Sequence, residues 1–215
     1  MAIIGLMIIA LAGHTSAWAA APAIPDDLED LILESPVQLK HFELINHRHQ
    51  PFNIKNLEGK WTFIFFGYTH CPDICPTTLA ELNTAAAQLA EKQGATNTAN
   101  NASNNATSND TQFVFVSVDS ARDTIDELAE YISYFNKDFV AVTGLKEQLT
   151  ELTTQLGVKF EIGDGTPTLY FVSHASAVLL IDPQARYYAR FKAPHYSEVL
   201  ISGLNKIRDF HQLGQ

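Results

Sequence analysis

Hydrophobic residues form short runs and periodic stripes along most of the chain. Two continuous apolar runs, 61–68 (WTFIFFGY) and 113–119 (FVFVSVD), are short enough for strands and apolar enough to predict strands buried on both faces. Between them, apolar residues at spacings of three and four predict an amphipathic helix: Leu79, Leu82, Ala86 and Leu89. This part of the chain therefore has the strand–helix–strand order of an α/β fold.

The same criteria predict further elements on both sides of this unit. Upstream, residues 41–58 have the pattern of a hairpin with a turn at 47–51. Downstream we expect a helix over 125–135 opened by Asp123 and Thr124, then a short strand or loop at 139–144, then a helix over 145–156 that Gly157 ends. Strands 168–172 and 177–182 are expected to form a hairpin through residues 173–176. An edge strand at 187–191 and a closing helix over 199–210 complete the predicted elements. This order predicts a thioredoxin-like α/β sandwich, a central mixed β-sheet flanked by helices, with an N-terminal hairpin extension.

The segments outside this pattern define the domain organisation. Residues 1–21 have the apolar core and the A-x-A site of a secretory signal peptide, or alternatively an uncleaved N-terminal anchor, although no Lys or Arg precedes Lys40. The acidic, proline-containing segment 22–38 is typical of a linker or arm, and 39–215 forms a single domain. The Asn/Thr/Ala-rich tract 94–111 has no large apolar side chain and is expected to be a loop insertion. We therefore expect an exported, periplasmic protein, with anchoring to the inner membrane as the alternative.

Charge and cysteine content exclude several classes of protein. The formal net charge of −10 makes nucleic acid an unfavourable partner. Two cysteines in 215 residues are too few for a disulfide framework, so the fold depends on a hydrophobic core.

The two cysteines, Cys71 and Cys75, lie where the predicted strand 61–68 leads into the following helix. Residues four positions apart on a helical turn share one face, so both sulfurs can reach one metal ion or, after local adjustment, form a disulfide. A helix N-terminus favours the thiolate that both kinds of chemistry need. Two thiolates cannot hold an iron–sulfur cluster and closed zinc sites take four ligands, so copper with an added imidazole fits best.

Two alternatives to a metal or redox site remain open. Cys75 shares a helical stripe with Leu79 and Leu82, so it fits an inert core position as well. A structural disulfide between Cys71 and Cys75 is the other alternative, although so short a loop would add little stability.

The block 59–82 (GKWTFIFFGYTHCPDICPTTLAEL) resembles the signature of the Sco (SenC) family, copper-binding assembly factors for cytochrome c oxidase. Further blocks agree with the family's patterns: VSVDSARDT (116–124), VTGLKEQ (142–148), and YFVSH (170–174) with Asp182-Pro183 eight residues after the histidine. The resemblance runs from about Phe42 to Phe191. It implies a copper-binding protein that delivers copper to the dinuclear copper site of oxidase subunit II, or to another cuproprotein.

The resemblance also implies the ligands. The family's CxxxC cysteines match Cys71 and Cys75, and its distal histidine matches His174, giving one copper ion, Cu(I) or Cu(II), on three side chains. The chain departs from the family pattern at four positions: Ser120 for Pro, Ser173 for Asp, Ala175 for Ser and Ala185 for Gly. Ser173 and Ala175 flank the histidine, where they bear on its orientation.

Several other residues compete for a role in the site. His70 is adjacent to Cys71 and is a candidate for influencing its acidity or metal exchange, whereas His47 and His49 flank a turn and are expected to be solvated. His195 and His211 fall in the C-terminal region. Pro167, in GTPTL, resembles the cis-proline that faces the active-site cysteines in thioredoxins.

The cysteines also support a different function. A thiol–disulfide oxidoreductase would attack an acceptor disulfide with Cys71 and resolve the mixed disulfide with Cys75, without needing His174. An oxidoreductase would require an upstream thiol reductant, whereas a copper chaperone would require an upstream copper donor. A copper or redox sensor would use the same site with a different partner.

Overall fold

The structure, a computed structural model, describes residues 23–99, 110–166 and 170–213, and only the backbone within 92–99. The predicted signal segment 1–21 and Pro167 lie outside the described residues. Eight strands form one mixed sheet in the order β1-β10-β9-β4-β5-β6-β2-β3. These strands are β1 (Ile32–Gln38), β2 (Glu43–Asn46), β3 (Pro51–Asn53), β4 (Trp61–Gly67), β5 (Thr111–Ser117), β6 (Val140–Thr143), β9 (Val178–Ile181) and β10 (Arg186–Phe191).

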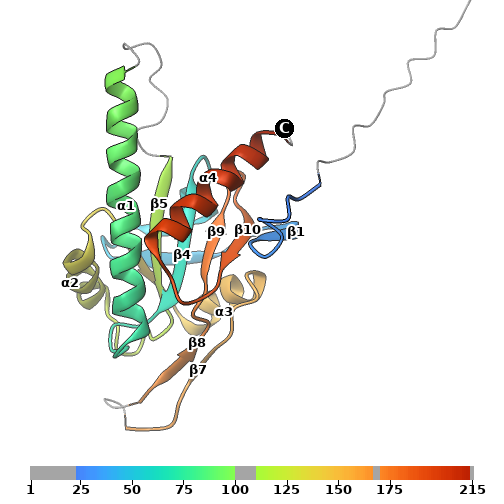
Figure 1. The fold of residues 1–215 in the computed structure, drawn as a ribbon. Coiled ribbons are helices and arrows are strands. Elements are labelled where there is room, and N and C mark those ends of the chain that lie inside the picture. Colours follow the sequence, from blue (N-terminus) through green and yellow to red (C-terminus); the bar gives the residue numbers. More distant parts are fainter. Residues whose placement is uncertain (1–22, 100–109, 167–169, 214–215) are drawn as a thin grey trace, which may run out of the picture.

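Four helices accompany the sheet in the described residues. The helices are α1 (Ile74–Ala99), α2 (Ile125–Phe135), α3 (Lys146–Gln155) and α4 (Ser197–Leu213), with a short 3-10 turn η1 (Ile54–Asn56). The first and the last of them, α1 and α4, lie side by side across one face of the sheet (Figure 1). The thioredoxin-like sandwich predicted from the sequence is confirmed, as is the β2–β3 hairpin, which joins the sheet through β6. Among the described residues, none of the helices is long and apolar enough to cross a membrane.

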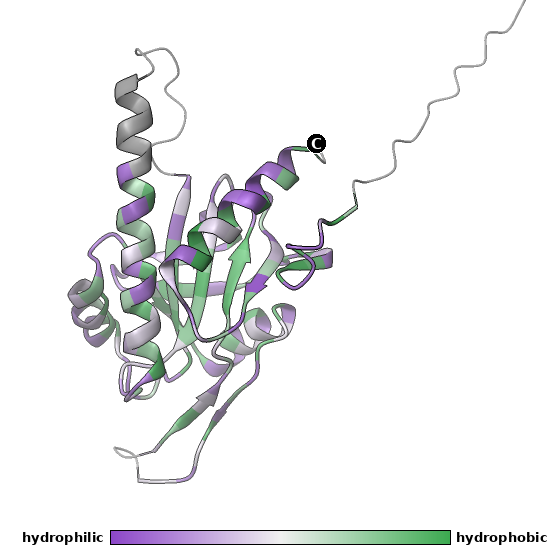
Figure 2. Ribbon diagram, viewed as in Figure 1, coloured by the Kyte–Doolittle hydropathy of each residue, from purple (hydrophilic) through white to green (hydrophobic). Residues whose placement is uncertain are grey.

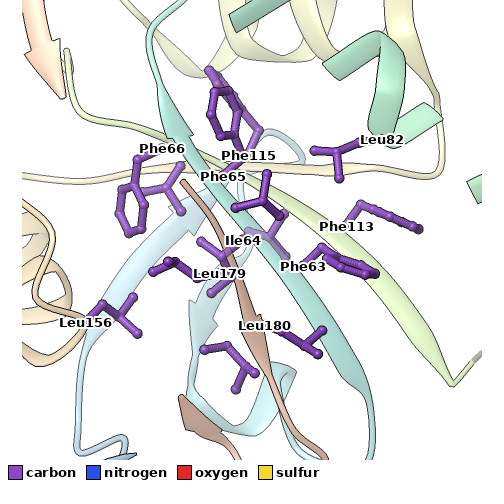
Figure 3. Close-up of a cluster of buried hydrophobic side chains, with 14 of the residues drawn as sticks. Phe63, Ile64, Phe65, Phe66, Leu82, Phe113, Phe115, Leu156, Leu179 and Leu180 are labelled. Atoms are coloured by element: carbon purple, nitrogen blue, oxygen red, sulfur yellow. The ribbon is translucent and has the colours of Figure 1, made fainter. Parts of the chain in front are cut away.

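Strand β4 forms the centre of the core because every one of its residues is buried. It pairs in parallel with β5 and antiparallel with β9. Side chains of β4 alternate between the faces, so that Phe63 lies on the same side of the strand as Leu82 of α1, and Phe66 lies on the other side with Leu156 (Figure 3). The sheet strands are hydrophobic and the helices turn polar residues outward (Figure 2). This core holds the carboxyl end of β4 rigidly beneath the start of α1.

The predicted hairpin between strands 168–172 and 177–182 is wrong. Strand β8 (Val172–His174) instead pairs with β7 (Phe160–Ile162) in a separate two-stranded sheet, here called the ribbon. Strand β9 has β4 on one edge and β10 on the other, so it has no edge left for β8. The ribbon extends away from the body of the protein (Figure 1), and residues 167–169 between its strands lie outside the described residues.

Three further expectations are corrected. Residues 22–38 are not only a linker, because β1 pairs antiparallel with β10, and Pro36 is tolerated because β1 is an edge strand. The strand at 187–191 is therefore not an edge strand. Helix α1 continues to Ala99, into the tract 94–111 expected as a loop; residues 100–109 lie outside the described residues.

Candidate metal centre

The two cysteines occupy the link between β4 and α1 in different environments. Cys71 lies in the loop before the helix and is 8% exposed, whereas Cys75 is in the first turn of α1 and is fully buried. The backbone N–H of Cys75 donates a hydrogen bond to the Sγ of Cys71 at 3.4 Å. Cys71 Sγ thus accepts a hydrogen bond from one of the N–H groups that a helix N-terminus leaves without a partner inside the helix. Both cysteines are free thiols.

Gly67 makes room for the sulfur of Cys75. A Cβ atom added at Gly67 would lie 2.8 Å from Cys75 Sγ and 2.7 Å from the ring of Phe115, both shorter than real contacts allow. Gly67 is the last residue of β4, and so the sulfur packs directly against the end of the central strand. The glycine in the FFGYTHC segment therefore has a steric reason, since any side chain there would displace one half of the site.

His174 reaches this point from the ribbon. It is the last residue of β8, and its Nε2 lies 3.5 Å from Cys75 Sγ. Its Nδ1 lies 3.0 Å from the Ala175 carbonyl oxygen, which can only accept a hydrogen bond. Nδ1 must therefore carry the proton, and the Nε2 lone pair is directed to the cysteine side. This is the tautomer that an Nε2 metal ligand requires.

Cys71, Cys75 and His174, predicted from spacing and resemblance, therefore converge. Their ligand atoms all lie within 4.8 Å of one another, and they are the single group of this kind among the described residues. Two sulfurs and one imidazole nitrogen form a soft, three-donor set, which suits copper better than hard cations such as Mg²⁺ or Ca²⁺. The rings of Phe65 and Tyr68 stand edge-on to His174, at 6.1 and 6.0 Å between centroids, and keep this side of the site apolar.

Asp123 holds the loop that carries Cys71. This carboxylate is fully buried and accepts hydrogen bonds from the backbone N–H of Thr69 at 2.9 Å, the hydroxyl of Thr69 at 2.6 Å, and the hydroxyl of Ser117 at 2.6 Å. It thereby joins the end of β5 to the loop after β4. The sequence pattern predicts for Asp123 only a place at the opening of a helix, although the family-like block 116–124 contains this residue.

A second buried network connects the end of β5 to the chain leading into β8. Asp119 accepts hydrogen bonds from Arg122 Nε at 2.6 Å and from the Tyr170 hydroxyl at 2.5 Å. The Arg122 guanidinium stacks on the Tyr170 ring at 3.5 Å and lies 5.6 Å from the centre of the Tyr68 ring. No sequence signal apart from the family-like blocks pointed to this network, because Tyr170 is 51 residues away from Asp119 along the chain.

Burial controls the acidity of the candidate ligands. It raises the pKa of the Cys75 thiol, and the neighbouring Cys71 raises it further. Burial also lowers the pKa of His174, so its imidazole is neutral at physiological pH. The expectation that a helix N-terminus favours the thiolate is therefore wrong for Cys75 in the metal-free protein, because desolvation outweighs the helix. A bound cation would supply the charge that this buried sulfur lacks.

None of the other histidines in the described part of the chain belongs to this three-residue group. His70 is half-exposed and directs Nδ1 to the Thr69 hydroxyl at 3.0 Å and toward Asp123 at 3.7 Å. His49 is exposed beside Asp126, as expected, but His47 is half-buried and accepts a hydrogen bond from the Ala141 N–H. His211 packs between Trp61 and Tyr188. His195 is buried, and the sequence around it gives no indication of this burial.

Known proteins that resemble this chain include copper-binding proteins, in agreement with the soft donor set of the site. The SCO1/SenC family matches residues 33–209. A Stutzerimonas stutzeri protein named "Putative copper-binding protein" is 33% identical over 203 residues, 94% of this chain and 91% of that protein. By contrast, the chain spans about half the length of mitochondrial relatives such as SCO1 homolog 1 of Arabidopsis thaliana (47%).

Two solved structures are also similar. Arabidopsis thaliana ScoI with copper bound has 30% sequence identity and a TM-score of 0.68, covering 79% of this chain and 98% of that one. Yeast Sco1 with copper bound has 25% identity and a TM-score of 0.69, covering 81% and 90%. With a family match over most of its length, a thioredoxin-like fold in common with these structures, and a CxxxC…His donor set, the chain belongs to the SCO1/SenC family.

Proposed function

We propose that this protein binds one copper ion through Cys71, Cys75 and His174 and delivers it to the dinuclear copper site of cytochrome c oxidase subunit II. The observation that carries the proposal is the convergence of the three donor atoms within 4.8 Å from separate elements of the fold. The copper-bound relatives support the choice of metal. The cytochrome c oxidase context comes from the family, and another cuproprotein remains the alternative acceptor.

Delivery would proceed by ligand exchange without a change in the oxidation state of copper. Each thiolate of the acceptor would form a new bond to copper as one bond to this protein breaks, and each cysteine so released would take up a proton. Cys75 would take up its proton readily because burial raises the pKa of its thiol. Cys71 is the more exposed of the two sulfurs, so we expect an incoming thiolate to approach from its side.

Copper titration of the reduced protein tests this proposal. We expect the wild type to bind one copper ion with a thiolate-to-Cu(II) absorption band. His174→Ala should weaken binding by more than the roughly 10–100-fold that loss of an outer-shell partner costs, because it removes a ligand itself. His49→Ala is the matched control, since His49 is exposed beside Asp126 and should leave the titration unchanged. Equal binding by His174→Ala and wild type would refute the three-ligand site.

The apparent copper affinity should rise with pH. Cys75 must lose its proton to bind copper, and burial raises the pKa of its thiol, so binding near neutral pH releases that proton. We expect about a tenfold gain in affinity per pH unit for each proton released. His174 adds little to this slope near neutral pH because its lowered pKa leaves it already unprotonated. Competition with a chelator between pH 6 and 8 measures the slope, and a flat profile would contradict a buried thiol ligand.

A thiol–disulfide oxidoreductase is the second candidate function. It is favoured by the two free thiols, which lie close together, and by the position of Cys71 as the more exposed of the two sulfurs. Cys71 would attack an acceptor disulfide and release one acceptor thiol, and Cys75 would displace the second. The acceptor would gain two electrons and two protons, and an upstream thiol reductant would then reduce the Cys71–Cys75 disulfide. If His174→Ala loses no ability to reduce a peptide disulfide and the wild type binds copper poorly, this function replaces copper delivery.

We also propose that the protein is exported to the periplasm, either released by cleavage after residues 1–21 or held at the inner membrane by them. The proposal rests on the apolar run and the A-x-A pattern of this segment. An alkaline phosphatase fusion after residue 38 would be active only if the segment directs export.

A further inference from the structure

His195 forms a buried hydrogen bond to the loop that follows His174. It is 7% exposed, and its Nε2 lies 2.7 Å from the carbonyl oxygen of Ser176. A carbonyl oxygen only accepts, so Nε2 carries the proton and donates. Burial lowers the pKa of His195, which agrees with a neutral ring. The bond joins the approach to α4 with the connection from β8 to β9, two residues beyond the candidate ligand.

Packing alone does not account for a histidine at this position. The Nδ1 of His195 is buried and has no hydrogen-bond partner. An unsatisfied buried nitrogen costs about 1–3 kcal/mol, so an apolar ring of similar size would be cheaper if the side chain only filled space. Unlike an apolar ring, His195 can donate a hydrogen bond to the carbonyl oxygen of Ser176.

The Ser176 bond restrains the same short segment as the contacts of His174. Ala175 N–H donates to the Lys159 carbonyl at 3.3 Å, and His174 Nδ1–H donates to the Ala175 carbonyl at 3.0 Å. The ring of Phe65, fully buried in β4, lies edge-on to both histidines, at centroid distances of 6.1 Å for His174 and 6.5 Å for His195. The two histidines thus share one rigid aromatic neighbour from the central strand.

The chain beyond His195 is in turn attached to the helix that carries Cys75. Glu81 of α1 accepts a hydrogen bond at 2.7 Å from the backbone N–H of Ser197, the first residue of α4. We call the pair of bonds His195–Ser176 and Ser197–Glu81 the brace. Through it, the loop after His174 is tied to α1 two turns beyond Cys75. The brace therefore spans the cysteine and histidine halves of the site.

We propose that His195 is a positioning residue that sets the orientation of His174 relative to Cys71 and Cys75 through its hydrogen bond to Ser176. The proposal rests on the proposed copper site, because the orientation of His174 matters only if its Nε2 is a ligand. His195 is not a member of the three-residue donor group, and its contacts are with Ser176 and Phe65. Its effect passes through the backbone of residues 174–176, where the ribbon ends and the main sheet resumes.

Three substitutions separate the hydrogen bond from the ring. In His195→Gln the amide nitrogen lies the same number of bonds from Cβ as Nε2 does in histidine, so it can still donate to Ser176. In His195→Asn the amide nitrogen stops one bond shorter, and in His195→Phe the ring remains without a donor. His211→Gln is the matched control, because His211 packs on Trp61, at the opposite end of β4 from the cysteines.

The readouts are copper affinity, the Cu(II) absorption and electron paramagnetic resonance spectra, and the melting temperature of the metal-free protein. We expect His195→Phe and His195→Asn to lose roughly tenfold or more in affinity and to change the spectra. His195→Gln should stay within a few-fold of wild type with unchanged spectra, whatever its melting temperature, and His211→Gln should leave the copper spectra unchanged.

Unchanged affinity and spectra in His195→Phe would overturn the proposal, and so would equal losses in the Gln and Phe variants. Failure of the copper site itself gives a different result. In that case the wild type lacks a tight copper complex or His174→Ala leaves it unchanged. If the wild type binds copper, His174→Ala loses it, and His195→Phe retains it, only the brace is refuted.

Discussion

Cys75→Ser should abolish stable copper binding while leaving the fold intact. The change exchanges one atom in a fully buried side chain, so the packing against Gly67 is preserved. A serine hydroxyl is a hard donor that stays protonated near neutral pH, whereas the soft thiolate is what selects copper. Because a ligand is lost, the drop in affinity should exceed the roughly 10–100-fold typical of an outer-shell change. Metal content after desalting and the thiolate-to-Cu(II) band measure the effect.

The neighbouring helical turn provides a control. Thr77→Ala removes an exposed hydroxyl that donates to the Asp73 carbonyl and touches no ligand atom, so copper content should stay at the wild-type level. If Cys75→Ser retained one copper ion per chain together with the absorption band, the buried sulfur would not be a ligand. The donor set would then need a different member.

Asp123→Ala should have the largest effect on stability. Removing the carboxylate takes away the acceptor of three hydrogen bonds: one from the buried Ser117 hydroxyl, and two from the N–H and the hydroxyl of the half-buried Thr69. Each unsatisfied buried group costs about 1–3 kcal/mol, and so we expect a loss of about 3–4 kcal/mol in the free energy of unfolding. Urea unfolding of the reduced, metal-free protein measures it.

Asp126→Ala is the matched control for this prediction. Asp126 is three residues further along, in the first turn of α2, and its exposed carboxylate pairs with the exposed His49 at 3.4 Å. Such surface pairs contribute about 0–1 kcal/mol, so the unfolding midpoint should barely move. If the two alanine variants unfolded at the same urea concentration, Asp123 would not organise the loop before Cys71.

Local pattern was sufficient for the elements that are buried or strongly periodic. The apolar runs in β4 and β5, the stripe along α1, and the Thr124 cap of α2 all indicate their structure within a few residues. Strand pairing is a different problem, because it depends on which edges remain free. A three-residue strand such as β7 carries little signal, and its partner β8 could equally have paired with β9. The acidic composition of 22–38 similarly obscured an edge strand, β1.

The residues of the site likewise fall into those that local sequence predicts and those that depend on tertiary contacts. The spacing of Cys71 and Cys75 is a local property, so the sequence alone predicted that they share a site. The place of His174 beside them depended on family resemblance, since 99 residues separate it from Cys75. Asp123 and His195 act through tertiary contacts, with hydroxyl groups and a backbone N–H for Asp123 and with a backbone carbonyl for His195. Such groups are common along any chain, and only the folded protein shows which polar residues contact them.

Helix α1 has a consequence for how this protein can be handled in the laboratory. Its 26 residues correspond to a rod of about 39 Å, with Cys75 in the first turn and Ala99 at the last. A fluorophore or affinity handle attached at the far end would lie several helix diameters from the sulfur atoms. The distance lets a partner approach the cysteines while the handle holds the protein to a surface, so that transfer can be followed on an immobilised donor.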